Sequence, residues 1–142
     1  MIVVSIVGLL ASLAIPAYER FLLRSKRAEF AVNVEGIRLT EEAYRAEWDI
    51  FTSCAISPST IPGRVAVSFP ANETTSLDWN HIGWVPDGRV YGQYRVVANA
   101  QPGALTGFVA DSFGDIDGDG NLSNVQGTEL LKPALLTPNN VF

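Results

Sequence analysis

The residues best suited to chemistry lie in an acidic loop at residues 114–121 and directly after it. Carboxylates at alternate positions around a glycine, in the order D-x-D-x-D-G, direct several hard oxygens at one cation, as calcium-binding loops do. Oxygen-bearing side chains stand at the first, third, fifth, seventh and ninth positions of such a loop: Asp115, Asp117, Asp119, Asn121 and Ser123. The loop is therefore a candidate site for structural calcium, and the sequence indicates no other cofactor.

The loop departs from the complete calcium-binding pattern at its last ligand. The twelfth position is Gln126 rather than an acid that binds in bidentate fashion. Either Glu129 or Asp111 would have to complete the site through a looser geometry. We therefore expect an affinity in the range of extracellular modules, about 10⁻⁴ to 10⁻³ M. The alternative is a tight Asp and Gly hairpin with solvated carboxylates, since D-G turns are common.

The remaining nucleophiles and bases do not form a catalytic pattern. Cys54 is the single cysteine, which excludes an intramolecular disulfide and is typical of a small packed side chain. His81 is the single histidine and stands among aromatic residues, where a packed or surface position is expected. Glu41 has no partner nucleophile, metal-ligand cluster or second carboxylate at a defined spacing. We therefore expect that the protein is not an enzyme.

Charge divides the chain into two parts. Residues 1–48 carry six basic and six acidic side chains, whereas residues 49–142 carry four basic and nine acidic ones, so the second part holds the whole net charge of −5. Nucleic-acid binding needs a basic footprint for phosphates, which an acidic head lacks. At 142 residues the chain has room for one domain with a modest core. We expect no nucleic acid among its partners.

The acidic loop must be positioned by a fold whose first element is apolar. No charge occurs between Met1 and Ile15, and Pro16 leads from this run into a charged stretch with helical periodicity. We expect an apolar anchor over residues 1–24 that continues as an amphipathic helix over residues 25–53. A buried core helix is one alternative, because this run is shorter than the roughly 20 residues that cross a bilayer. A signal peptide is another, although a basic n-region and an A-x-A-like site are missing.

Two faces are expected on the helix after residue 25. Large side chains fall within about 100° of one another, as in a helix packed under a sheet; these are Phe30, Val34, Ile37, Tyr44, Trp48 and Phe51. Smaller side chains form a stripe on roughly the opposite side, called the outer stripe below: Ala28, Val32, Gly36, Leu39, Ala43 and Ala46. The outer stripe suits lateral packing in a filament and equally suits a solvated alanine face. Glu41 projects into the large-residue face, where Arg38 or Arg45 could pair with it.

Beyond Phe51, short runs separated by turn residues predict a globular head at residues 54–142. A β-like run occupies residues 64–69 within a loop region. The runs at 82–85 and 89–98 flank the turn Pro86-Asp87-Gly88 and predict a β-hairpin, and the runs at 107–113 and 122–131 flank the acidic loop. The predicted fold class is therefore α+β, with a long N-terminal helix packed under a small antiparallel sheet of about four strands.

The N-terminal segment MIVVSIVGLLASLAIPAY resembles that of type IV pilins and secretion pseudopilins, with Gly8, Pro16, Ala17 and Tyr18 in register. The head, WVPDGRVYGQYRVV followed by a strand and GDIDGDG, is similar to pilin-like proteins in a weaker way. The resemblance implies a helix that spans the bacterial inner membrane once and later packs into a filament core. The residues of that helix are Met1, Ile2, Val3, Val4, Ile6, Val7, Gly8, Leu9, Leu10, Leu13, Ile15 and Pro16.

The same resemblance implies partners and a place in the cell. The partners are other pilin subunits, the inner membrane before assembly, the prepilin peptidase and the pilus assembly platform. The final location is an extracellular pilus or a periplasmic pseudopilus. Family members carry a glutamate two residues before the position of Met1 and a basic leader, so we expect the true start of the chain to lie upstream. The positive-inside rule would place the basic cluster at residues 20–27 in the cytoplasm, whereas the resemblance implies the opposite orientation.

We therefore expect a structural subunit of a type IV pilus-like filament, either a major or a minor pilin. A type II secretion pseudopilin is an alternative that the calcium-like loop favours, since pseudopilin heads use calcium in a C-terminal loop. A membrane-anchored binding module that never polymerises is a second alternative.

Overall fold

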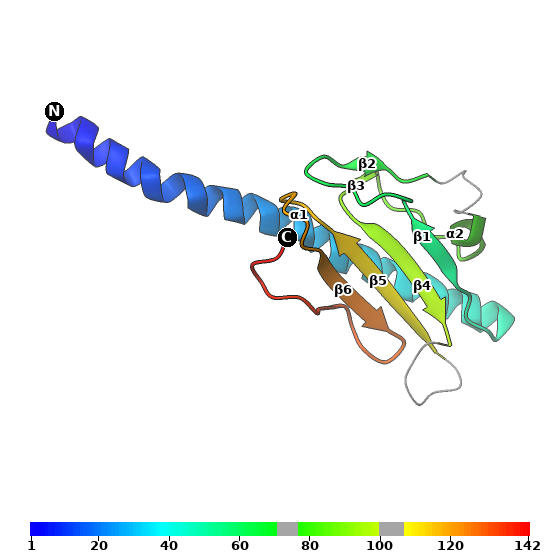
Figure 1. The fold of residues 1–142 in the computed structure, drawn as a ribbon. Coiled ribbons are helices and arrows are strands. Elements are labelled where there is room, and N and C mark those ends of the chain that lie inside the picture. The colour runs from blue at the N-terminus through cyan, green and yellow to red at the C-terminus, as the bar shows by residue number, and fades with distance from the viewer. Residues whose placement is uncertain (71–76, 100–106) are drawn as a thin grey trace.

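A computed structural model of the chain describes residues 1–70, 77–99 and 107–142. Its longest element is α1 (Ile2–Trp48), a helix of 47 residues whose first half projects away from a globular head (Figure 1). Pro16 removes one intrahelical hydrogen bond, yet α1 continues through it. The helix ends where Asp49 adopts a left-handed conformation (φ 57°) and donates its N–H to the carbonyl of Arg45 at 2.8 Å. It therefore stops at Trp48 and does not reach Phe51.

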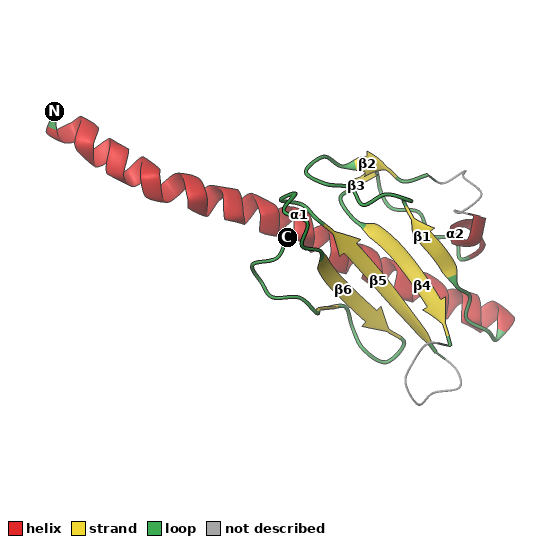
Figure 2. Cartoon of the chain, viewed as in Figure 1, coloured by secondary structure: helices red, strands yellow, loops and turns green. Residues whose placement is uncertain are grey.

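The second half of α1 lies across an antiparallel sheet (Figure 2). Five strands form this sheet in the order β1-β4-β5-β6-β7. Their bounds are β1 Cys54–Ser57, β4 Gln93–Ala98, β5 Phe108–Gly114, β6 Ser123–Thr128 and β7 Ala134–Leu135. A two-stranded sheet of β2 (Val67–Ser68) and β3 (Arg89–Val90) and the short helix α2 (Leu77–His81) complete the described elements. The α+β class and the helix-on-sheet layout are confirmed.

The strands that flank the acidic loop are close to their predicted positions, whereas the hairpin at residues 82–98 is wrong. The run at 82–85 follows α2 and forms no strand. The predicted strand at 89–98 is split into β3, which pairs with β2, and β4, which pairs with β1 and β5. The edge strands β1 and β7 were not predicted. Both are too short for alternation to appear in the sequence, and tertiary pairing alone creates them.

Phe30 of α1 packs directly onto the backbone of the sheet. A Cβ placed on Gly114 would lie 2.2 Å from Cζ of Phe30, and one placed on Gly92 would lie 2.7 Å from its Cε1. Only glycine leaves room for the ring at these two positions. Because Gly114 ends β5 and opens the acidic loop, this contact holds the start of the loop against α1.

The large-residue face of α1 supplies part of the core. Phe30, Val34 and Ile37 are fully buried, and Phe51 follows the helix at 9% exposure. Tyr44 is partly buried against this core. Trp48 is 60% exposed instead, because it is the last residue of α1 and contacts the ring of Tyr44 rather than the sheet. A cluster of aromatic rings belongs to the same core: Phe69, Trp79, Trp84 and Tyr94.

Candidate functional site

The apolar half of α1 is exposed along its whole length. The large side chains predicted to contact membrane or neighbouring subunits, from Met1 to Ile15, are 54–104% exposed. A Cβ placed on Gly8 would meet nothing within 4 Å beyond its own turn of the helix, and Pro16 is also exposed. An 18-residue window of α1 has a mean hydropathy of 1.9 and is 0% buried. By length and composition α1 is able to cross a membrane, since 18 helical residues extend about 27 Å.

The outer stripe of α1 remains largely uncovered by the head. Val32 and Leu39 are 70% and 64% exposed, and Ala28, Ala43 and Ala46 are exposed as well. Gly36 differs, because a Cβ there would lie 3.0 Å from Nε1 of Trp84. The stripe is therefore exposed except at Gly36, which lies against the head.

The acidic loop joins β5 to β6 and is organised by the carboxylate of Asp115. Its Oδ1 accepts the N–H groups of Gly118 at 2.7 Å and Asp119 at 3.1 Å, and its Oδ2 accepts that of Gly120 at 3.1 Å. Gly118 and Gly120 both have positive φ, 72° and 84°, which the tight path of the loop requires. The side chain at the first position of the calcium-like pattern thus folds the loop around itself.

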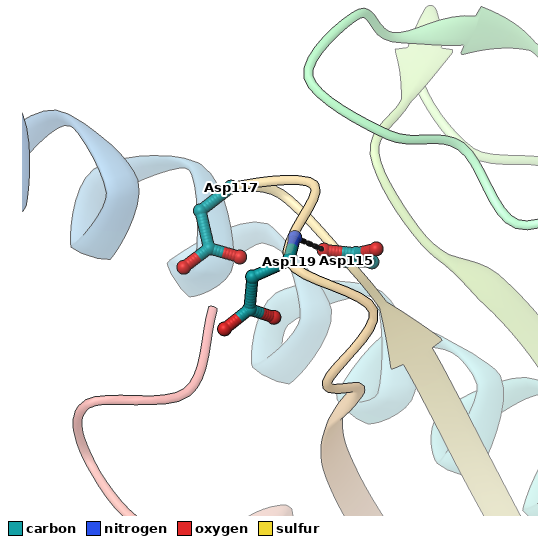
Figure 3. A group of neighbouring side chains, drawn as sticks. All are labelled: Asp115, Asp117 and Asp119. Atoms are coloured by element: carbon teal, nitrogen blue, oxygen red, sulfur yellow. Dashed lines mark hydrogen bonds between the residues drawn. The ribbon is translucent and has the colours of Figure 1, made fainter.

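The three aspartates converge as the sequence predicted. Asp115, Asp117 and Asp119 each place a carboxylate oxygen within 4.8 Å of the others (Figure 3). Burial and the neighbouring charge of Asp119 raise the pKa of Asp117, whereas hydrogen bonds from Asn121 lower the pKa of Asp119. Oxygens at this spacing can share a calcium ion, because a cation would relieve the mutual repulsion of the carboxylates.

The other predicted ligands have different partners. Asn121 donates its N–H and its amide to Asp119, at 2.7 and 2.9 Å. Ser123 is fully buried and donates its hydroxyl to the carbonyl of Gly114 at 3.1 Å, so it closes the base of the loop. Asp111 and Glu129, the residues considered for completing the site, are both engaged in ion pairs, with Arg95 and Arg45. Gln126 also donates to Asp111, at 2.8 Å.

Glu41 is buried without the predicted arginine partner. Arg38 pairs with Glu35 at 2.6 Å and donates to the carbonyl of Thr128, while Arg45 pairs with Glu129. The Oε2 atom of Glu41 accepts the N–H of Thr52 at 3.3 Å, and its Oε1 has no hydrogen-bond partner among the described residues. Burial is the main cause that raises the pKa of Glu41 to about 7. Burying this carboxyl without a charged partner lowers the stability of the fold by an amount that depends on pH.

Sequence reasoning missed the residues that contact the acidic loop from elsewhere in the chain. Arg64 donates its Nε–H to the carbonyl of Asp117 at 2.8 Å, and Lys26 of α1 donates to the carbonyl of Arg64 at 3.1 Å. No local pattern marks this chain of contacts, because its members lie 38 and 53 residues apart. Cys54 is buried and His81 is exposed, and neither joins the loop.

A comparison with curated proteins finds similarity to a pilin. Over 101 residues, or 70% of its length, the chain is 32% identical to the type IV major pilin protein PilA of Myxococcus xanthus. Over this stretch the chain is similar to a type IV pilin. The match covers 34% of that protein, so the chain spans about a third of the length of the curated protein it matches. No family model matches the chain, and no solved structure matches it significantly.

Proposed function

We propose that the chain is a structural subunit of a type IV pilus-like filament, a major or minor pilin. In this proposal α1 holds the subunit in the bacterial inner membrane as a single pass, and later packs against the helices of other subunits in the filament. The prepilin peptidase and the assembly platform are the partners that the family relationship implies. The protein would act by assembly, not by catalysis.

The observation that carries the proposal is the exposed apolar half of α1. Each large aliphatic side chain there would gain about 1.5–3 kcal/mol on leaving water. The window of 18 residues that is 0% buried therefore requires a membrane or a protein surface as its environment. One end of α1 is exposed and apolar, and the other end packs under the sheet. This arrangement supports a helix that moves from the lipid bilayer into a bundle of helices, because both environments exclude water from its apolar side chains.

The exposure of the outer stripe supports the proposal that the partners of α1 are other pilin subunits. An open apolar groove runs along Val32 and Leu39 of α1 and is bounded by Pro133. Small residues such as Ala43 allow another helix to approach closely. The groove lies on the half of α1 that packs under the head, on the same helix as the apolar anchor.

The test is the distribution of the native chain between the membrane and sheared surface filaments. A filament subunit is expected in both fractions, and the mass of its N-terminal peptide in the filament fraction would reveal processing and methylation. Recovery from the membrane alone, under conditions in which surface filaments are sheared from the same cells, would refute polymerisation at the surface. The membrane-anchored binding module or the secretion pseudopilin would then be the better description.

A second candidate within the same family is a type II secretion pseudopilin. The convergence of three carboxylates within 4.8 Å in the acidic loop favours it, because such a loop suits structural calcium. We propose that Asp115, Asp117 and Asp119 supply the ligands, with Asn121 contributing through its hydrogen bonds to Asp119. A pseudopilin is expected in a periplasmic assembly rather than in sheared surface filaments, so the same fractionation separates the two candidates.

A further inference from the structure

A cleft of about 280 Å³ lies where α1 leaves the head. Its floor is apolar and includes Leu22 of α1 and Ile116 of the acidic loop, and its rim is charged. Two rim residues are basic, Lys26 and Arg64, and two are acidic, Glu19 and Asp117. The volume is just below the range of about 300–1,000 Å³ that is usual for drug-sized ligands, so a small polar group fits it better than a large molecule.

The two cations of the cleft have hydrogen-bonding capacity to spare. Neither Lys26 nor Arg64 forms an ion pair with any residue that the structure describes. Lys26 uses one of its three N–H donors on the carbonyl of Arg64 and lies 4.6 Å above the ring of Tyr91. Arg64 uses its Nε–H on the carbonyl of Asp117, which leaves its terminal nitrogens for another acceptor. Two fixed cations at one rim suit a phosphate.

Neither carboxylate of the cleft, Asp117 or Glu19, forms an ion pair with a residue that the structure describes. Oδ1 of Asp117 is buried without a hydrogen-bond partner in the described part of the chain, and Glu19 is exposed on α1. The lining therefore has two positive and two negative groups. Asp115 and Asp119 add further negative charge within 4.8 Å of Asp117. A ligand that carries only negative charge is disfavoured here, whereas one that joins a phosphate to an ammonium matches both halves.

The position of the cleft identifies the source of such a ligand. Below it, α1 presents an apolar window long enough to cross a bilayer. Glu19, Leu22 and Lys26 follow this segment and would lie at the level of the lipid headgroups, where long basic side chains commonly reach the interface. The apolar floor would face the glycerol and the start of the acyl chains.

We propose that this cleft binds the headgroup of a membrane phospholipid that carries both a phosphate and a primary ammonium, as phosphatidylethanolamine does. Lys26 and Arg64 hold the phosphate. Asp117 and Glu19 accept hydrogen bonds from the ammonium when the acidic loop holds no calcium. The proposal rests on the membrane-anchored stage of the proposed function and adds a lipid partner to it. Contact with the headgroup would orient the head on the membrane before assembly.

The test uses the full chain in vesicles of equal parts phosphatidylethanolamine, phosphatidylcholine and phosphatidylglycerol. After mild detergent extraction, native mass spectrometry counts the lipids that each chain retains. We expect phosphatidylethanolamine in about tenfold excess over the other two, the effect of one charge-assisted hydrogen bond. Phosphatidylcholine has a quaternary ammonium without N–H donors, and phosphatidylglycerol lacks the cation.

Two variants and one control examine the cleft itself. Arg64→Gln removes a phosphate ligand and should lower the amount of phosphatidylethanolamine that each chain retains. Leu22→Trp fills the cleft without removing a charge and should lose the excess over the other two lipids. Arg24→Gln removes an exposed cation of α1 outside the cleft and should keep it. Equal retention of the three lipids, or Leu22→Trp behaving as the wild type, would overturn the headgroup site alone. A chain that fails to enter the vesicles would overturn the membrane anchor, and the headgroup site with it.

Discussion

The buried carboxyl of Glu41 should make the stability of the head depend on pH. Its pKa is raised from 4.5 to about 7, mainly by burial, and the N–H of Thr52 only partly offsets this. The unfolded chain therefore loses this proton near pH 4.5, whereas the folded chain keeps it to about pH 7. Stability falls across this interval as the pH rises, and a shift of this size corresponds to about 3 kcal/mol above pH 7.

The groups that face Glu41 do not remove this effect. Arg38 and Arg45 are bound to other acceptors, and the buried thiol of Cys54 has a pKa raised by burial and by Glu41 itself, so it stays neutral. Burial also raises the pKa of Glu29, which adds pH dependence of the same sign. A comparison with Glu41→Gln isolates the contribution of Glu41, because the variant retains every other titrating group.

The assay is urea unfolding of the full chain in detergent micelles at pH 5 and pH 8, followed by the fluorescence of the buried Trp79 and Trp84. The wild type should lose about 3 kcal/mol more than Glu41→Gln between these pH values, a shift of roughly 1–3 M in the urea midpoint. Burying an amide also has a cost, so the change with pH decides the outcome rather than the absolute stability. Glu47→Gln, on the same helix and exposed, is the matched control and should retain the pH dependence of the wild type. The reasoning is refuted if Glu41→Gln and the wild type respond equally to pH.

Three further predictions concern other parts of the chain. Gly114→Ala should destabilise the head by about 1–3 kcal/mol in the same urea assay, because its Cβ would overlap the ring of Phe30. Calcium at about ten times its dissociation constant should stabilise the wild type by about 1.4 kcal/mol, and the double variant Asp117→Ala, Asp119→Ala should abolish the calcium-dependent rise in melting temperature. Ala43→Leu, in the outer stripe, should lower the yield of sheared filaments without lowering the amount of chain in the membrane.

Each of these three has a result that contradicts it. Gly63→Ala is the control for Gly114→Ala, because its Cβ would lie 3.8 Å from the carbonyl of Asp115, an ordinary contact. Equal stability of the two variants would contradict the prediction for Gly114→Ala. If calcium raises the melting temperature of the double variant as much as that of the wild type, the acidic loop is not the site. An unchanged filament yield for Ala43→Leu would show that the outer stripe does not pack against a neighbour.

Local patterns in the sequence determined the elements that repeat over many residues. The apolar run up to Ile15 and the 3.6-residue periodicity beyond it predicted α1, which ends at Trp48 rather than at residue 53. The run at residues 107–113, bounded by turn residues, predicted β5, and the D-x-D-x-D-G spacing predicted that three carboxylates lie close together. These features depend on neighbours in the chain, so the sequence alone contains the information.

Only the tertiary structure decided which partners distant residues have. Helical spacing placed Arg38 and Arg45 within reach of Glu41, but Glu35 and Glu129 bind them and leave the buried carboxyl unpaired. The charged cleft joins α1, the loop at Arg64 and the acidic loop, and short strands such as β1 and β7 exist because another strand lies beside them. Such contacts depend on the free energy of the whole packed chain, in which burial and competing partners outweigh local propensity.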